Sequence, residues 1–212
     1  MAIGMVMVRA AAWWDFYGNY GNRDGNGEMG RGNMLGEDGM HDMGLVGQRQ
    51  RRWVKPSGGV IKLNIDGALE VTKGVFGTGA VCRDENGTCI GVLAVPMVGF
   101  VSPQTCEFLA LVNGLHFCLQ AGFTRLEIEG DAQNIFQALN SDQEDLSSDG
   151  ALVDEAKVLL SSFQFCSWGY IPRECNNAAH CVAKVALSLP FPTYWWRMAP
   201  DWLIPILVDE SL

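Results

Sequence analysis

Residues 62–69 read KLNIDGAL, a segment in which polar and apolar side chains alternate. The polar positions are Lys62, Asn64 and Asp66, with leucine and isoleucine between them. A period of two residues predicts a half-buried β-strand. Aspartate is a poor strand former, and Gly67 already supplies the freedom in φ that a turn needs. Asp66 therefore either caps a loop or stands at the strand end to hold a positively charged group.

Two more strands are expected directly after this one, at residues 77–82 and 88–95. The turn between them contains Asn86-Gly87. This pair is a strong hairpin signal because both residues tolerate a positive φ. The sequence therefore predicts three antiparallel strands in succession.

A helix is expected to begin at Pro103, with Ser102 as a suitable N-cap, and to end at Gly122. Beyond it, the pattern predicts a strand at 125–130, helices at 132–140 and 149–162, a strand at 163–171 and a helix at 176–189. This order predicts an α/β fold with a five-stranded mixed sheet flanked by helices. In that sheet, three antiparallel strands are followed by parallel strands.

Composition divides the chain into a leader, a domain and a tail. Residues 18–47 hold ten glycines and show no apolar periodicity, so burial cannot offset the entropy of ordering them. We therefore predict a disordered glycine-rich leader at 1–52 and a folded domain at 53–190. A tryptophan-rich C-terminal tail at 191–212 is expected to pack on the domain.

The charge of the chain bears on its partners. The formal net charge is -9, and residues 1–52 hold six basic and six acidic side chains. All the excess negative charge therefore belongs to residues 53–212. Such a charge disfavours broad electrostatic attachment to nucleic acid or to an anionic membrane.

The seven cysteines form no CxxC pair, and several lie within apolar runs. This usage indicates buried free thiols in a reducing compartment. Cys175, His180 and Cys181 lack a second ligand pair at zinc spacing, so zinc is not expected. No run of about 18 apolar residues is present, and we expect no membrane span.

Three acids fall near the ends of predicted elements. Asp66 closes the first strand, Glu107 lies in the first turn of the first helix, and Asp131 follows the fourth strand. Ligand sites of open α/β sheets lie at such strand ends, and gathered carboxylates repel one another unless a cation lies between them. Oxygen ligands of this kind suit Mg²⁺ or Mn²⁺. Each acid also has an ordinary explanation. Asp66 can be a loop acid, Glu107 a first-turn acid favoured by the helix dipole, and Asp131 an N-cap.

Five ordered motifs point to a known family. They are KLNIDGAL, GTGAVCRDENG, CEFLALVNGL, LEIEGDAQNI and IPRECNNAAHCVAKVAL. Together they resemble the ribonuclease H type-1 domain of plant proteins, the reverse-transcriptase-like group descended from retroelements. The resemblance covers residues 53–190 and implies a ribonuclease H-like fold for this segment.

The resemblance also implies an activity and a site. Asp66, Glu107 and Asp131 match the metal-binding carboxylates of the family, and the fourth acid of the family falls on His180. The implied cofactor is Mg²⁺ or Mn²⁺. The implied reaction is endonucleolytic hydrolysis of RNA in RNA–DNA hybrids by two metal ions. Recognition of 2′-hydroxyls across a wide minor groove would select the RNA strand.

The sequence departs from the catalytic pattern in three places. His180 removes one negative charge and supplies a softer ligand, which would weaken binding of a second metal. The loop IPRECNN leaves no room for the mobile histidine of bacterial relatives, and no Lys or Arg lies between Asp131 and Ser148. A second interpretation is therefore a weakly active or silent domain that binds nucleic acid or a protein partner.

A third class, the sugar-kinase-like proteins with related sheet topology, would need a second glycine-rich phosphate loop and a second domain. The sequence contains neither. From the resemblance we expect an RNA–DNA hybrid or another nucleic acid as partner. We also expect no membrane association and a monomer.

Overall fold

The computed structural model describes residues 52–141, 143 and 147–211, so the predicted leader lies outside the described residues apart from Arg52. The strands are β1 (Ile61–Glu70), β2 (Val75–Arg83), β3 (Cys89–Val98), β4 (Arg125–Gly130), β5 (Phe165–Tyr170) and β6 (Thr193–Trp196). The α-helices are α2 (Pro103–Gln120), α3 (Gln133–Leu139), α4 (Gly150–Leu160), α5 (Asn177–Ala186) and α6 (Ile204–Ser211). Two short 3₁₀ helices, η2 (Val71–Lys73) and η3 (Arg173–Cys175), complete this part of the chain.

The strands form one mixed sheet in the order β5-β4-β1-β2-β3-β6. β1, β2 and β3 pair antiparallel, whereas β4 pairs parallel with both β1 and β5. This arrangement confirms the predicted fold class. The prediction lacked β6, which comes from the tryptophan-rich tail and pairs antiparallel with β3. β6 has only four residues, too few to show a period of two.

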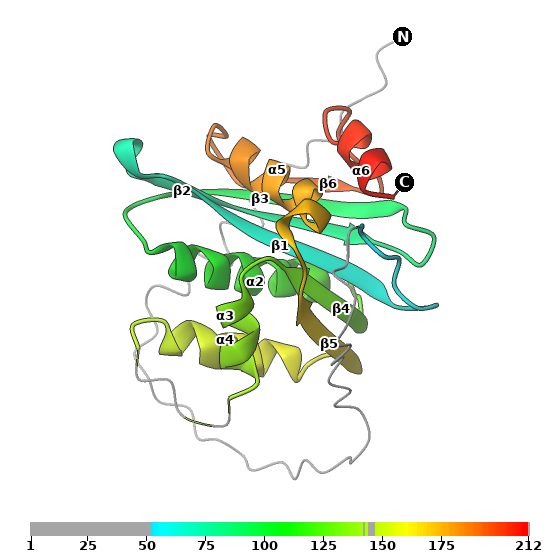
Figure 1. Cartoon of the computed structure of the whole chain (residues 1–212), viewed down its shortest axis with the longest axis horizontal. Helices are drawn as coiled ribbons and strands as arrows, with labels where there is room; N and C mark the ends of the chain where they lie inside the picture. Colours follow the sequence, from blue (N-terminus) through cyan, green and yellow to red (C-terminus); the bar gives the residue numbers. More distant parts are fainter. Residues whose placement is uncertain (1–51, 142, 144–146, 212) are drawn as a thin grey trace.

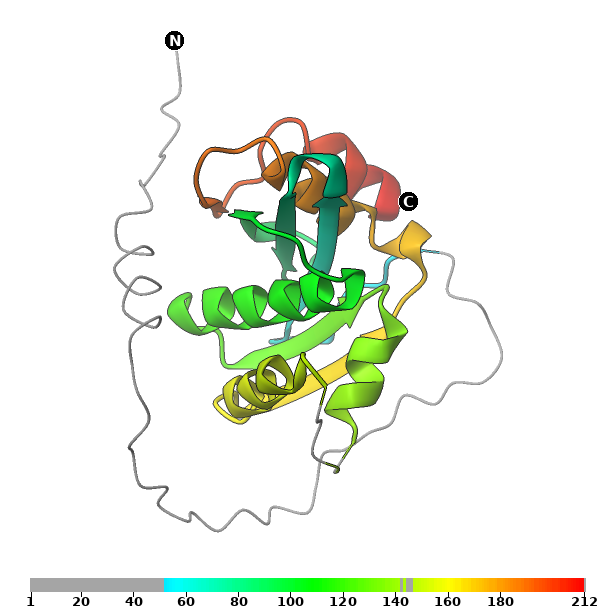
Figure 2. The ribbon, with the colours of Figure 1, turned by 90° about the vertical axis from the view of Figure 1, so that its left-hand side faces the viewer.

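Helices cover both faces of the sheet. Figure 1 and Figure 2 show α2, α3 and α4 on one face, and α5 and α6 on the other. The larger apolar core lies under α2 and includes Leu63, Ile65 and Leu111. A smaller core on the opposite face includes Val182 of α5 and Leu203, directly before α6.

β1 is buried on both faces and is not the half-buried strand that was expected. Lys62 and Asn64, expected on an exposed face, are only 1% and 0% exposed. Lys62 Nζ donates a hydrogen bond to Glu129 Oε1 at 2.6 Å, and Asn64 Nδ2 donates to Glu129 Oε2 at 3.1 Å. The polar side chains are therefore buried because β4 supplies partners for them.

Most element boundaries shift by a few residues from their predicted positions, and the predicted start of α2 is confirmed. The Ser102 hydroxyl accepts a hydrogen bond from the Thr105 N–H, as an N-cap does. All seven cysteines lie in the described part of the chain and are free, as expected. Among the described residues, no helix combines the length and the apolarity needed to cross a bilayer.

Candidate metal centre

Asp66 and Asp131 come from neighbouring parallel strands. β1 continues to Glu70, so Asp66 lies inside the strand and does not end it as predicted. The parallel ladder nevertheless stops at the pair Asn64–Glu129. Asp66 and Asp131 each follow this last pair by two residues, which brings both acids to the same edge of the ladder. Asp131 is not a helix cap, since α3 begins after Ala132 without a side-chain cap.

Glu107 reaches the same edge from α2. It lies beyond the first turn of this helix, not within it as predicted. Gly67 lets the helix approach closely: a Cβ added there would lie 2.7 Å from Cys106 Sγ and 3.0 Å from the Cys106 carbonyl carbon. Glu107 also accepts a hydrogen bond from the Gly67 backbone. Glycine beside Asp66 therefore allows α2 to bring Glu107 to the site.

The three acids form one cluster. One carboxylate oxygen each from Asp66, Glu107 and Asp131 lies within 4.8 Å of the others. Glu107 Oε2 is buried and has no hydrogen-bond partner. An unpartnered buried carboxylate oxygen is costly unless a cation or a proton satisfies it. The donor set thus fits a hard divalent cation such as Mg²⁺ or Mn²⁺.

Electrostatics in the cluster favour the same conclusion. Burial, followed by the negative charges of Glu107 and Asp131, raises the pKa of Asp66 to about 9. Burial, followed by Asp131, raises the pKa of Glu107 to about 7. Without a cation the cluster therefore holds protons near neutral pH, and a divalent cation would displace them.

His180 reaches the cluster from the opposite face of the sheet. Its Nδ1 lies 2.8 Å from Asp66 Oδ2, and its Nε2 lies 2.9 Å from a guanidinium nitrogen of Arg173. Burial, then the positive charges of Arg173 and Lys184, lower the pKa of His180. A neutral ring with its proton on Nδ1 satisfies both contacts, donating to Asp66 and accepting from Arg173.

α5 holds His180 in place because it lies directly on two glycines of β2. A Cβ added at Gly79 would lie 2.4 Å from the Ala183 nitrogen and 2.6 Å from the Ala179 oxygen. A Cβ added at Gly77 would meet the same helix. Since Gly79 pairs with Asp66 across β1 and β2, this close packing brings the first turns of α5 over Asp66.

Two further residues of the site were not predicted from the sequence. Arg173 of η3 has a 62% exposed side chain, and its guanidinium lies 3.7 Å from Asp131 Oδ2. Asn176 is fully buried and donates through Nδ2 to the Ile65 carbonyl at 2.9 Å and to Asp131 Oδ1 at 3.2 Å. Both lie in the segment IPRECNN. The sequence showed that this segment is short, but it gave no sign that either side chain would contact Asp131.

The family model described as Reverse transcriptase-like matches residues 64–186, a segment that includes all four candidate site residues. An Arabidopsis thaliana protein named "Putative ribonuclease H protein At1g65750" is 28% identical over 174 residues. That match covers 79% of this chain and 28% of the relative, so the chain spans little more than a quarter of its length.

Solved structures share the fold. RNase H1 from the halophilic archaeon Halobacterium salinarum has a TM-score of 0.57 and 25% identity, over 61% of this chain and 98% of that one. LC11-RNase H1 in complex with an RNA/DNA hybrid has a TM-score of 0.50 and 22% identity, over 60% and 96%. These likenesses confirm the ribonuclease H-like fold. Since the family model matches more than half of the sequence, the chain belongs to the reverse transcriptase-like family.

Proposed function

We propose that this chain is a metal-dependent endoribonuclease that hydrolyses the RNA strand of RNA–DNA hybrids by a two-metal mechanism. The observation that carries the proposal is the convergence of Asp66, Glu107 and Asp131 within 4.8 Å, from β1, α2 and β4. A decayed site would have no physical reason to retain one buried and two partly buried acids that repel one another.

The residues of the cluster have distinct parts in the proposed reaction. Asp66 is the most buried of the three acids and would be the central ligand of the divalent cations. Glu107 and Asp131 would complete the acidic ligand set, and His180 would lie beside it through its contact with Asp66. When bound, the divalent cations supply Lewis-acid activation of water and charge stabilisation of the leaving 3′ oxygen. Asn176 fixes Asp131 through its hydrogen bond.

The substrate class is proposed from chemistry and from relatives. LC11-RNase H1 has been solved with an RNA/DNA hybrid, and the Arabidopsis relative carries a ribonuclease H name. The Arg173 guanidinium lies 3.7 Å from Asp131 Oδ2 and is exposed enough to meet a phosphate. Contacts to 2′-hydroxyls in the minor groove would direct hydrolysis to the RNA strand.

A second candidate is a nucleic-acid-binding or partner-binding domain with little activity. The contact between His180 and Arg173 favours it, because two nitrogen groups stand where the family has an acid. The formal net charge of -9 also opposes tight binding of a polyanion. The two candidates differ in whether a bound hybrid is cut.

Cleavage of an end-labelled RNA–DNA hybrid, with Mg²⁺ and with Mn²⁺, tests the proposal. The wild-type chain should cut the RNA strand only when a divalent cation is present, and Asp66→Asn should abolish cutting. Asp154→Asn is the matched control, since it removes one acid from the exposed surface of α4 and should leave the rate unchanged. Binding of the hybrid without cutting in either metal would favour the second candidate and overturn the first.

A further inference from the structure

We propose that Glu210 of the C-terminal helix α6 is a positioning residue that caps α5 and holds His180 beside the carboxylate cluster. This inference rests on the proposed function, because it assigns the tail a part in the same metal centre. It concerns a contact between segments far apart in the chain, since Glu210 and its partner Arg83 are separated by 127 residues.

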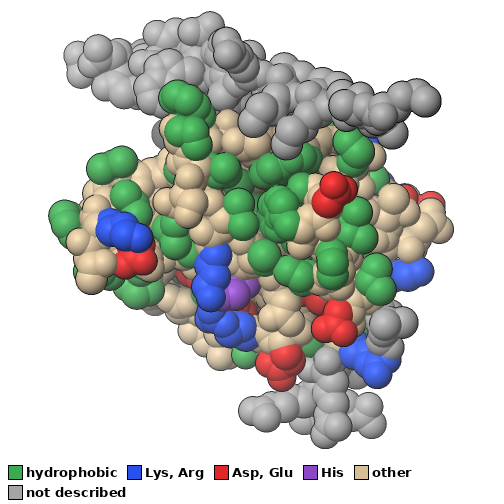
Figure 3. Space-filling view, turned by 90° about the horizontal axis from the view of Figure 1, so that it is seen from above, with side chains coloured by type: hydrophobic (Ala, Val, Ile, Leu, Met, Phe, Trp, Pro, Cys, Tyr) green, Lys and Arg blue, Asp and Glu red, His purple; other side chains and the backbone are tan. Residues whose placement is uncertain are grey.

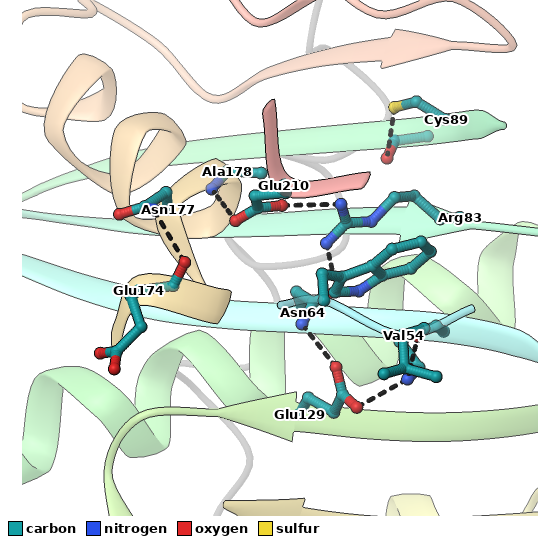
Figure 4. A network of polar contacts seen from close by, with 12 residues as sticks. Val54, Asn64, Arg83, Cys89, Glu129, Glu174, Asn177, Ala178 and Glu210 are labelled. Atoms are coloured by element: carbon teal, nitrogen blue, oxygen red, sulfur yellow. Dashed lines mark hydrogen bonds and ion pairs between the residues drawn. The ribbon is translucent and has the colours of Figure 1, made fainter. Parts of the chain in front are cut away.

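Glu210 takes the place of an N-cap for α5. The helix begins at Asn177, and its N-cap residue, Asn176, makes no side-chain capping bond. Glu210 Oε1 instead accepts a hydrogen bond from the Ala178 N–H at 2.9 Å (Figure 4). The first N–H groups of a helix lack partners within the helix, and a negative charge there is favoured by the helix dipole. The tail thus supplies a cap that the sequence next to α5 does not.

The other carboxylate oxygen of Glu210 contacts Arg83 of β2 and so connects α6 to the sheet. Glu210 Oε2 lies 2.7 Å from an Arg83 guanidinium nitrogen, and both side chains are buried. The second terminal nitrogen of Arg83 donates to Asn64 Oδ1 at 2.7 Å, and the guanidinium stacks 3.7 Å from the Trp53 ring centroid. Figure 4 shows Glu210 between Ala178 and Arg83, with Glu129 beyond Asn64.

This network ends next to the metal centre in three places. Asn64 and Glu129, which are hydrogen-bonded to each other, precede Asp66 and Asp131 by two residues each. Ala178 precedes His180 by two residues in the first turn of α5. Within this network, the buried ion pair between Glu210 and Arg83 holds α6 against the sheet. The position of α6 is therefore coupled to both strands that carry the acids and to the helix that carries His180.

Binding of Mn²⁺ to the protein alone, measured by calorimetry, is the first readout because it does not depend on hydrolysis. Glu210→Ala should weaken Mn²⁺ binding about tenfold, as loss of a group that orients a ligand does. Glu210→Gln should weaken it less, because an amide oxygen still accepts from Ala178. Asp209→Ala is the matched control: it removes one exposed acid from the same helix and should change nothing.

Amide hydrogen exchange is the second readout. Glu210→Ala should raise exchange in the first turn of α5 while α2 stays protected. The double variant Arg83→Met with Glu210→Leu separates positioning from stability, because it repacks the buried pair without restoring the cap. We expect it to regain thermal stability but not Mn²⁺ affinity.

Three results would overturn the inference: unchanged Mn²⁺ affinity in folded Glu210→Ala or Glu210→Gln, unchanged exchange in α5, or full recovery of affinity in the double variant. If Glu210→Ala fails to fold, the Glu210→Gln and double variants still decide. A wild-type protein that binds Mn²⁺ but does not cut hybrids would refute the proposed nuclease and leave the positioning role of Glu210 intact.

Discussion

Asp66 is 1% exposed and lies beside two other acids, so its ionisation is unfavourable unless a cation is near. At the scale of single residues, this is the property that most distinguishes the site from an ordinary surface cluster. The pH dependence of stability in the metal-free protein therefore reports on the site, because protons occupy the cluster when cations do not.

The first prediction concerns stability and pH without metal. In the folded protein the pKa of Asp66 is about 9 and that of Glu107 about 7, both above their ordinary values of 3.8 and 4.5. The folded state therefore binds more protons than the unfolded chain between pH 4 and 9, and its stability falls as pH rises through this window. With a chelator present, the melting temperature should fall by several degrees from pH 6 to pH 9. Saturating Mg²⁺ should remove most of that fall.

Asp66→Asn is the control for this measurement. An amide does not ionise, so the variant should lose the larger part of the pH dependence and be more stable than wild type at pH 9. Equal slopes for the two proteins would mean that Asp66 ionises normally.

Arg173 gives a prediction with opposite signs in two assays. Its guanidinium lies 3.7 Å from Asp131 Oδ2 and repels a cation bound to the cluster, but it is well placed to meet a phosphate. Arg173→Ala should therefore tighten Mn²⁺ binding slightly and lower hybrid cleavage about 100-fold, as loss of one oxyanion donor does. Arg173→Lys should keep part of the activity. If both metal binding and cleavage weakened together, Arg173 would have only a structural part.

His180 gives a prediction about metal choice. His180→Asp would place a fourth acid beside Asp66 and should raise cleavage more with Mg²⁺ than with Mn²⁺, because imidazole suits the softer ion. Cleavage rates measured against metal concentration for both ions check this. Identical metal curves for wild type and His180→Asp would remove His180 from the site.

At the scale of elements, the packing of α5 on β2 decides where His180 lies. Gly79→Ala would place a methyl group 2.4 Å from the Ala183 backbone nitrogen, so the helix must shift. We expect a loss of about 1–3 kcal/mol in the free energy of unfolding, typical of overpacking, and weaker metal binding. Denaturant unfolding and Mn²⁺ titration measure the two effects.

Gly169→Ala in β5 is the matched control, because nothing lies within 4 Å of the added methyl group and its φ is not positive. It should change stability by only a few tenths of a kcal/mol, because the added methyl group meets nothing. A Gly79→Ala variant as stable as this control would contradict the close approach of α5.

The elements differ in how well sequence alone predicts them. Strands and helices with clear periodicity, such as β1 and α2, could be predicted because their local pattern fixes their type. β6 and α6 could not, because a four-residue strand has no period and α6 docks through a pair 127 residues apart. The clustering of the acids could be anticipated from strand order. The positions of Arg173 and Asn176 depend on the path of one short loop.

At the scale of the whole molecule, the two faces of the sheet have different parts. α2 supplies Glu107 and covers the main core, whereas α5 supplies His180 and is capped by the tail. Figure 3 shows many apolar side chains on the face formed by α5 and α6, where Trp202, Ile204 and Val208 are each more than a third exposed. The domain therefore has an acidic cluster served from both faces of the sheet and exposed apolar side chains over α6.

The most direct measurement of the central claim is anomalous scattering from crystals of this chain soaked in Mn²⁺. We predict an anomalous peak bonded to carboxylate oxygens of Asp66, Glu107 and Asp131 together, and its loss in Asp66→Asn. Crystals with no peak at the cluster at saturating Mn²⁺, in which the three acids still converge and His180 still contacts Asp66, would contradict the claim that these acids form a metal centre.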